Sequence, residues 1–88
     1  MTVKKLWTDR AWEGYLYYQA EDRKTLNRLN QIIQDIDRGG YEGIGNPEPL
    51  TGNLTGYWSR RITKEHRLVY RLTKDGIEIV SCRFHYSK

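Results

Sequence analysis

One carboxylate in this sequence lies between two prolines. Glu48 follows Pro47 and precedes Pro49, and Pro49 favours an extended backbone at the residue before it. A carboxylate on such a stiff segment suits general-base chemistry, which needs a fixed distance to the proton that is transferred. The same three residues also fit a rigid, solvated turn, and the residue types alone favour this simpler interpretation.

The C-terminal third of the chain is basic. Residues 57–88 contain eight basic and three acidic residues, whereas residues 1–56 contain seven and eight. Most of these basic residues are arginines, whose planar guanidinium groups bind phosphates through paired hydrogen bonds. They are Arg60, Arg61, Arg67, Arg71 and Arg83. A solvated charged surface and a nucleic-acid-binding surface explain this pattern equally well.

Alternation of residue types sorts these side chains onto two faces of a sheet. We expect strands at 57–62, 67–72 and 77–86, joined by turns around 63–65 and 74–76. The apolar face is predicted to hold Trp58, Ile62, Leu68, Tyr70, Leu72, Val80, Cys82 and Phe84. The opposite face is predicted to collect Arg61, Arg67, Arg83 and His85, with Tyr86 at the end of the strand. Arg60 shares the face of Trp58, where it can stack on an aromatic ring or pair with an acid.

A carboxylate beside such a basic face suits the cleavage of RNA. RNA carries its own nucleophile, the 2′-hydroxyl, so the reaction needs neither a metal nor a covalent enzyme intermediate. Glu48 would accept the 2′ proton, the arginines would stabilise the phosphate, and His85 or Tyr86 would protonate the leaving 5′ oxygen. Taken singly, His85 and Tyr86 also fit solvated surface residues. His66 fits a half-buried structural residue.

Two helices are expected to support this sheet. Thr8 can cap a helix that runs to about residue 20, with Ala11, Trp12, Tyr15 and Leu16 toward the core and Tyr17 exposed. Asp22 can cap a second helix that ends near residue 38. Its buried stripe is predicted to be Leu26, Leu29, Ile32, Ile33 and Ile36. A short strand at 2–7 and a glycine-rich loop at 39–56 complete the α+β pattern.

Length and composition exclude several classes of protein. The 88 residues fit a single domain that spans 1–88, with 38% hydrophobic and 30% charged residues. No stretch is apolar enough for a signal peptide or a membrane span, so we expect a soluble, cytoplasmic protein without membrane contact. The one cysteine, Cys82, lacks partner ligands for zinc. We therefore predict no metal or other cofactor.

Several motifs, in order along nearly the whole chain, resemble one known family. They are Trp7-Thr8, the segment 12–19 (WEGYLYYQ), 46–50 (NPEPL), 53–62 (NLTGYWSRRI) with 65–70 (EHRLVY), and 82–86 (CRFHY). The chain resembles the YoeB-like (Txe) branch of the RelE superfamily of toxin–antitoxin messenger-RNA interferases. This resemblance implies two helices on one face of a four- or five-stranded antiparallel sheet, as in microbial ribonucleases.

The resemblance also implies an activity and partners. It implies a metal-independent endoribonuclease that cleaves messenger RNA in the ribosomal A site, leaving a 2′,3′-cyclic or 3′ phosphate and a 5′ hydroxyl. Glu48 takes the general-base position, Arg67 the phosphate-stabilising position, and His85 and Tyr86 the last two catalytic positions. Arg61 takes a supporting basic position, Arg83 lies beside it, and we add Arg60 as a phosphate-contact candidate. A YefM-type antitoxin and a homodimer are implied as well.

The sequence departs from the family in two places. The family's proline-flanked loop is usually rich in lysine, whereas residues 39–56 contain neither Lys nor Arg, with Asn46 and Thr51 at two of the usual lysine positions. In addition, Ser87 and Lys88 follow Tyr86. These departures keep open the alternative of a protein that blocks the ribosome without cutting. The shared fold leaves a second alternative, a gyrase-targeting toxin. The family's gyrase-targeting relatives generally lack the His-Tyr pair, which disfavours the second alternative.

Overall fold

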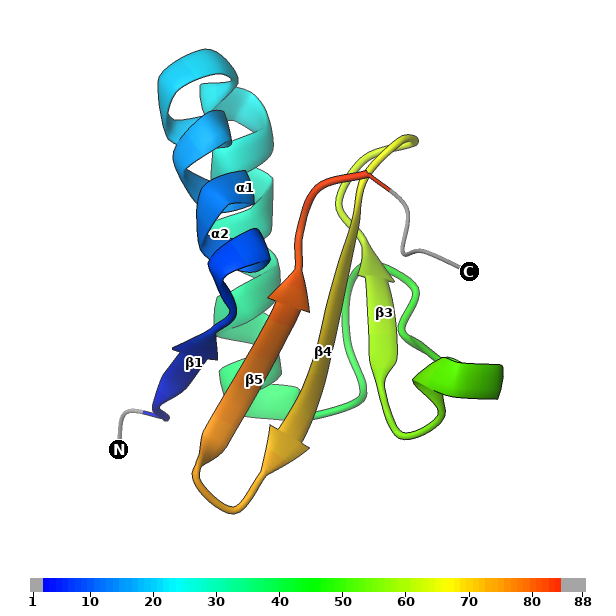
Figure 1. Cartoon of the computed structure of the whole chain (residues 1–88). Helices are drawn as coiled ribbons and strands as arrows, with labels where there is room; N and C mark the ends of the chain where they lie inside the picture. Colours follow the sequence, from blue (N-terminus) through cyan, green and yellow to red (C-terminus); the bar gives the residue numbers. More distant parts are fainter. Residues whose placement is uncertain (1–2, 85–88) are drawn as a thin grey trace.

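The computed structural model describes residues 3–84 (Figure 1), so the predictions for His85 and Tyr86 lie outside the described residues. Two helices and five strands form the described part, with one short 3-10 helix, Gly52–Leu54. The helices are α1, Asp9–Glu21, and α2, Arg23–Gly39. The strands are β1, Lys5–Trp7; β2, Glu48–Pro49; β3, Trp58–Arg61; β4, Arg67–Thr73; and β5, Gly76–Ser81.

The strands form one sheet in the order β1-β5-β4-β3-β2. The pairs β2–β3, β3–β4 and β4–β5 are antiparallel, as predicted, whereas β1 lies parallel to β5. The strands β3, β4 and β5 follow one another through short turns, which impose antiparallel pairing. Most of the chain separates β1 from β5, so no turn sets their relative direction. The predicted α+β fold is therefore confirmed, with a mixed sheet in place of an entirely antiparallel one.

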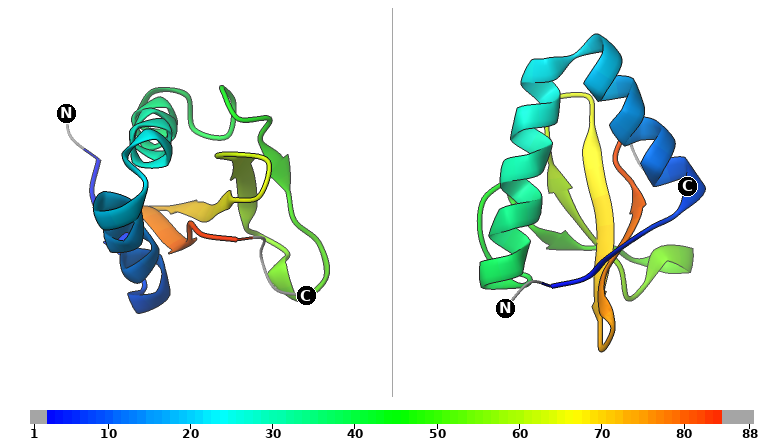
Figure 2. Two further views of the ribbon diagram at one scale, coloured as in Figure 1. Left: turned by 90° about the horizontal axis from the view of Figure 1, so that it is seen from above. Right: turned by 90° about the vertical axis from the view of Figure 1, so that its left-hand side faces the viewer.

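Both helices cover the same face of the sheet (Figure 2), and the hydrophobic core lies between these two layers. The prediction for α2 is confirmed, because all five residues of its apolar stripe are buried. The predicted caps are confirmed too: Thr8 Oγ1 accepts a hydrogen bond from the Ala11 amide, and Asp22 Oδ1 accepts one from the Thr25 amide. The first hydrogen bond satisfies an amide that begins α1, and the second satisfies one that begins α2.

The prediction for the buried face of α1 is partly wrong. Trp12 and Leu16 are 46% and 42% exposed, and Gly14 and Tyr18 join Ala11 as the buried residues. A side chain at Gly14 would place a Cβ atom 3.0 Å from Cys82 Sγ, so this glycine allows α1 to approach the chain just after β5. Tyr18 fills the adjoining space, and its hydroxyl donates to the Cys82 carbonyl at 2.8 Å. Because α1 approaches the chain at Cys82 closely, it buries the face that holds Gly14 and Tyr18 instead of the predicted face with Trp12 and Leu16.

The last strand is shorter than predicted and changes faces along its length. It ends at Ser81, and a bulge pairs Val69 with Ser81 but Tyr70 with Ile79, leaving Val80 as the extra residue. Ile77 and Ile79 therefore enter the core before the bulge and Cys82 enters it afterwards, while Phe84 is exposed and has a φ of 64°. The prediction that Val80, Cys82 and Phe84 share the core face is wrong, because the extra residue interrupts the period of two.

No helix in residues 3–84 has both the length and the apolar character needed to cross a membrane.

Candidate active site

Three neighbouring strands bring a carboxylate, a hydroxyl and a guanidinium together on the face of the sheet opposite the helices. Arg67 at the start of β4 donates from Nη2 to Glu48 Oε1 of β2 at 2.9 Å. It also donates from Nε and Nη2 to Ser59 Oγ of β3, at 3.1 and 2.9 Å. Glu48 and Ser59 are direct cross-strand partners, so the sheet register itself places the carboxylate beside the hydroxyl.

Burial differs sharply within this cluster. The Arg67 side chain is 10% exposed and the Glu48 side chain is 50% exposed, so the guanidinium lies at the base of the cluster and the carboxylate faces solvent. Nε and Nη2 of Arg67 are occupied by Ser59 and Glu48, while no hydrogen bond joins Nη1 to any residue of 3–84. A planar guanidinium held along one edge can present its other edge to a phosphate.

A second arginine lies beside this cluster. Arg61 on β3 is the cross-strand partner of Arg67 on β4, so both side chains belong to the same face. Like charges in this register repel each other, and Glu48 offsets the charge of Arg67 only. Arg61 is exposed, and no carboxylate of residues 3–84 pairs with it. The predicted grouping of Arg61 with Arg67 is what the structure shows, and an anion is the complement that this arrangement favours.

Arg60 lies on the other face of β3, inside the protein, with 0% of its surface exposed. Its Nε donates to Tyr70 Oη, and Nη1 donates to Asp35 Oδ2 at 2.6 Å and to the Ile44 carbonyl. Nη2 donates to the Gly40 and Glu42 carbonyls. All five N–H groups are therefore used within the protein. We accordingly leave Arg60 out of the phosphate-contacting set and assign it to the loop that follows α2.

Arg60 affects the pKa values of two neighbouring groups, Asp35 and Tyr70. Hydrogen bonds from Arg60 and from the Ile44 amide hold the pKa of Asp35 below its ordinary value, because both stabilise the ionised carboxylate. Burial raises the pKa of Tyr70, although the hydrogen bond from Arg60 opposes this effect. Asp35 is half-buried because its partner on β3 is fully buried.

Arg83 follows β5, and its side chain contacts Tyr17 of α1 and Phe84, not Glu48, Ser59 or Arg67. Its guanidinium carbon lies 3.4 Å from the ring centre of Tyr17 and 4.5 Å from that of Phe84. Tyr17 and Phe84 are exposed, as Tyr17 was predicted to be. Stacking on these two rings fixes the position of the Arg83 guanidinium without using its N–H donors. Arg83 thus belongs to a separate basic region.

His66 connects the end of the described chain to the candidate site. The Phe84 amide donates to His66 Nδ1 at 2.7 Å, and the Arg67 amide donates to the Phe84 carbonyl at 3.1 Å. The predicted structural role of His66 agrees with this hydrogen bond and with its half-buried position. These contacts bring Phe84, the residue before His85, next to the residue that pairs with Glu48.

Sequence patterns did not identify Ser59 as part of the site. A serine next to two arginines carries no signal of its own, because its role depends on the cross-strand register with Glu48. Within residues 3–84, no group of three or more His, Cys, Asp or Glu side chains is placed to hold a metal ion. The cluster offers a carboxylate, a fixed guanidinium and a second cation, which together suit proton transfer at a bound phosphate diester.

Comparisons with known proteins assign the chain to a family. The profile of the YoeB-like toxin of bacterial type II toxin–antitoxin systems matches residues 7–86. Toxin YoeB of Escherichia coli O6:H1 (strain CFT073) is 50% identical over 84 residues, which cover 96% of this chain and 100% of that protein.

Two solved structures from Staphylococcus aureus are also similar. The chain superposes on a YoeB dimer with a TM-score of 0.91 at 46% identity, and on a YoeB–YefM complex with a TM-score of 0.89 at 45% identity. Each match covers 98% of this chain and 100% of the other. With the family profile matching nearly the whole length, this chain belongs to the YoeB-like toxins of bacterial type II toxin–antitoxin systems.

Proposed function

We propose that this toxin is a ribosome-dependent endoribonuclease that cleaves messenger RNA in the A site without a metal ion. The observation that carries the proposal is the ion pair between Glu48 and Arg67 on the open face of the sheet. A carboxylate and a guanidinium in contact are the base and the charge stabiliser that attack by a 2′-hydroxyl requires. The products are a 2′,3′-cyclic or 3′ phosphate and a 5′ hydroxyl.

The geometry supports a division of roles. A phosphate that enters the site competes with Glu48 for Arg67, because both are anions and Nη2 serves the carboxylate in the free protein. Glu48 then accepts the 2′ proton as the 2′ oxygen bonds to phosphorus, and Arg67 stabilises the added charge. Arg61 supports the phosphate from the next strand. The bond from phosphorus to the 5′ oxygen breaks as that oxygen gains a proton.

The group that supplies this last proton stays a prediction. We propose His85 as the general acid, with Tyr86 beside it. The hydrogen bonds of Phe84 to His66 and Arg67 support the proposal, because they bring the residue before His85 close to the phosphate-stabilising arginine. Each member of an acid–base pair typically contributes about 10²–10⁴-fold in rate.

The partners of the relatives suggest those of this toxin. The solved Staphylococcus aureus structures contain a YoeB–YefM complex and a YoeB dimer. We accordingly propose a YefM-type antitoxin and a homodimer for this chain, which would act in the cytoplasm as one domain spanning residues 1–88. The ribosome and messenger RNA are its proposed targets.

Mapping of RNA ends after brief expression without an antitoxin tests the proposal. Primer extension on translated messages should show cuts in the A site, and Glu48→Ala and His85→Ala should each reduce cutting by at least about 100-fold. Glu21→Ala is the matched control, because it removes an exposed carboxylate at the end of α1, outside the cluster. Equal cutting by Glu48→Ala and wild type would contradict the role of the base.

The same experiment distinguishes the non-cleaving alternative. A toxin that only occupies the ribosome would arrest translation and leave the message intact, and the arrest would survive His85→Ala. The absence of Lys and Arg from residues 39–56 is the observation that favours this alternative, because it removes cations next to Glu48. Intact messages during a complete arrest would replace the nuclease proposal by this one.

A further inference from the structure

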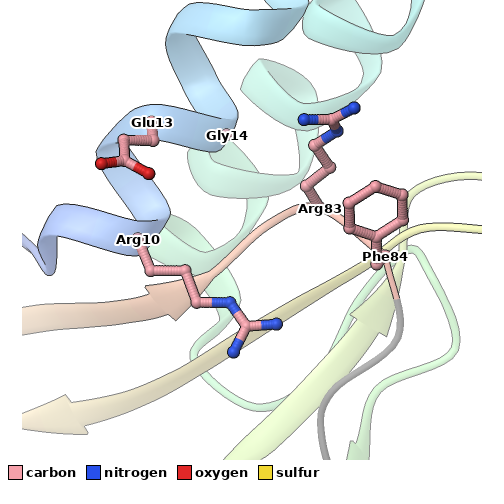
Figure 3. Close-up of a pocket in the computed structure, with 5 residues that line it drawn as sticks. All are labelled: Arg10, Glu13, Gly14, Arg83 and Phe84. Carbon is pink, nitrogen blue, oxygen red and sulfur yellow. The ribbon is translucent and has the colours of Figure 1, made fainter.

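A pocket of about 250 Å³ lies between α1 and the segment that follows β5 (Figure 3). Arg10, Glu13 and Gly14 line it from α1, and Arg83 and Phe84 line it from the other side. Arg10, Gly14 and Tyr17 follow one another at helical spacing, so one face of α1 looks toward Arg83. The Glu48 cluster contains none of these residues.

The chemistry of this pocket is that of a nucleotide site. It offers two guanidinium groups, and neither has a carboxylate partner within residues 3–84. Phe84 adds an aromatic ring that is 54% exposed. Proteins that hold single-stranded nucleic acid combine cations for the backbone with aromatic rings on which bases stack. Gly14 brings α1 close to Arg83, because a Cβ atom at this position would lie 3.3 Å from the Arg83 Cβ atom.

Arg83 is fixed in a way that suits this role. Its guanidinium lies against the rings of Tyr17 and Phe84, and its Nε is buried without a hydrogen-bond partner in the part of the chain that the structure describes. The buried Nε cannot reach an anion in the pocket, but no hydrogen bond joins Nη1 or Nη2 of Arg83 to any residue of 3–84. These two groups can therefore bind an anion, whereas those of Arg60 are saturated by protein groups.

The pocket adjoins the candidate active site through Phe84. The Phe84 carbonyl accepts a hydrogen bond from the Arg67 amide, so the exposed ring belongs to the residue paired with the phosphate-stabilising arginine. Because the Arg67 guanidinium lies on the face opposite the helices, an RNA strand with its scissile phosphate there would pass Phe84 to reach the pocket beside α1. Resting on the proposed function, we propose that this pocket is a second RNA subsite, which binds one nucleotide next to the scissile phosphate. Its base stacks on Phe84, and Arg10 and Arg83 bind its phosphate.

Substitutions at Arg10 and Glu13 should change the affinity for RNA in opposite directions. The Glu13 carboxylate lines the same pocket and repels a bound phosphate. Arg10→Gln should therefore weaken RNA binding and Glu13→Gln should strengthen it. Phe84→Leu keeps an apolar side chain but removes the ring, and it should weaken binding by about five-fold or more. Arg23→Gln is the matched control, because Arg23 is exposed on the first turn of α2 and does not line the pocket.

The measurement is the affinity for a six-nucleotide RNA that carries 2′-O-methyl groups, so that it cannot be cleaved, at several salt concentrations. Arg10→Gln should reduce the slope of log affinity against log salt by about 0.7, the value for one phosphate contact on a single strand. Phe84→Leu should leave this slope unchanged. Shortening the RNA by one nucleotide on one side of the cleavage position should abolish the effects of Arg10→Gln and Phe84→Leu, and shortening it on the other side should preserve both.

Three results would overturn the subsite: a wild-type protein that does not bind the RNA, an Arg10→Gln protein that binds as wild type does, or pocket variants that change the affinity for an acidic peptide but not for RNA. The last result would assign the pocket to a protein partner. Failure of the proposed nuclease is distinguishable, because it would appear as absence of cutting by wild type in the primer-extension assay, whatever the uncleavable RNA does.

Discussion

Replacing Arg60 by lysine separates the charge of this buried residue from its geometry. Five N–H groups of Arg60 donate to five acceptors, three of them carbonyls of the loop after α2. An ammonium group has three donors, so at least two acceptors lose their partner. Each buried group left unpaired costs about 1–3 kcal/mol, so the free energy of unfolding should fall by about 2–6 kcal/mol.

This loss is large for a protein of this size. A domain of 60–100 residues loses about 4–8 °C in Tm for each kcal/mol, so Arg60→Lys should lower Tm by at least about 8 °C. Thermal and urea unfolding followed by circular dichroism measure the change. Arg61→Lys is the matched control, because Arg61 is the next residue on β3 but faces solvent, and its stability should stay within about 0.5 kcal/mol of wild type.

An Arg60→Lys protein as stable as wild type would refute the reasoning, because a buried positive charge would then suffice and the hydrogen-bond pattern would be unimportant. Equal losses in Arg60→Lys and Arg61→Lys would also refute it, since the two residues differ chiefly in the face of the sheet that they occupy. A loss confined to Arg60 would show that its hydrogen bonds to the Gly40, Glu42 and Ile44 carbonyls stabilise the fold beyond the effect of its charge.

Three other predictions concern Ser59, Asp35 and Cys82. Ser59→Ala removes the acceptor of two hydrogen bonds from Arg67, so the single-turnover cleavage rate should fall by about 10- to 100-fold while KM changes little; an unchanged rate would exclude a positioning role. The depressed pKa of Asp35 means that its ionised form stabilises the fold above about pH 4, so the stability difference between wild type and Asp35→Asn should be constant from pH 7 to 5 and shrink in stronger acid; a difference that grows there would contradict the ion pair. Burial raises the pKa of Cys82 to about 12, so iodoacetamide at pH 8 should label it only in denaturant, and rapid labelling of the native protein would show an open structure.

The candidate site was only partly visible in the sequence. Glu48 was identified by its two prolines and Arg67 by its place on an alternating strand, and the structure joins them across 19 positions of sequence. Ser59 was missed, because a hydroxyl gains its role from the strand that lies opposite it. Alternation placed Arg60 and Arg61 on opposite faces of the sheet, but only the structure shows that Asp35 of α2 and the loop after α2 saturate the Arg60 guanidinium.

The amino-acid sequence by itself determined the features that depend on near neighbours. The caps at Thr8 and Asp22 and the apolar stripe of α2 require residues only three or four positions apart, and local hydrogen bonds and helical periodicity suffice to set them. The family motifs also depend only on the order of residues along the chain, so the sequence alone contains them.

Tertiary structure decided whatever depends on close approach between distant segments. The parallel direction of β1 and the bulge at Val80 depend on how distant strands pair, and the exposure of Trp12 depends on how α1 packs near Cys82, where Gly14 allows close approach. The contact between Glu48 and Arg67 depends on the register of β2, β3 and β4, and the pocket beside Phe84 depends on the position of α1. Their physical reason is that a sheet register and a helix rotation are chosen by the packing of the whole core, which no local pattern contains.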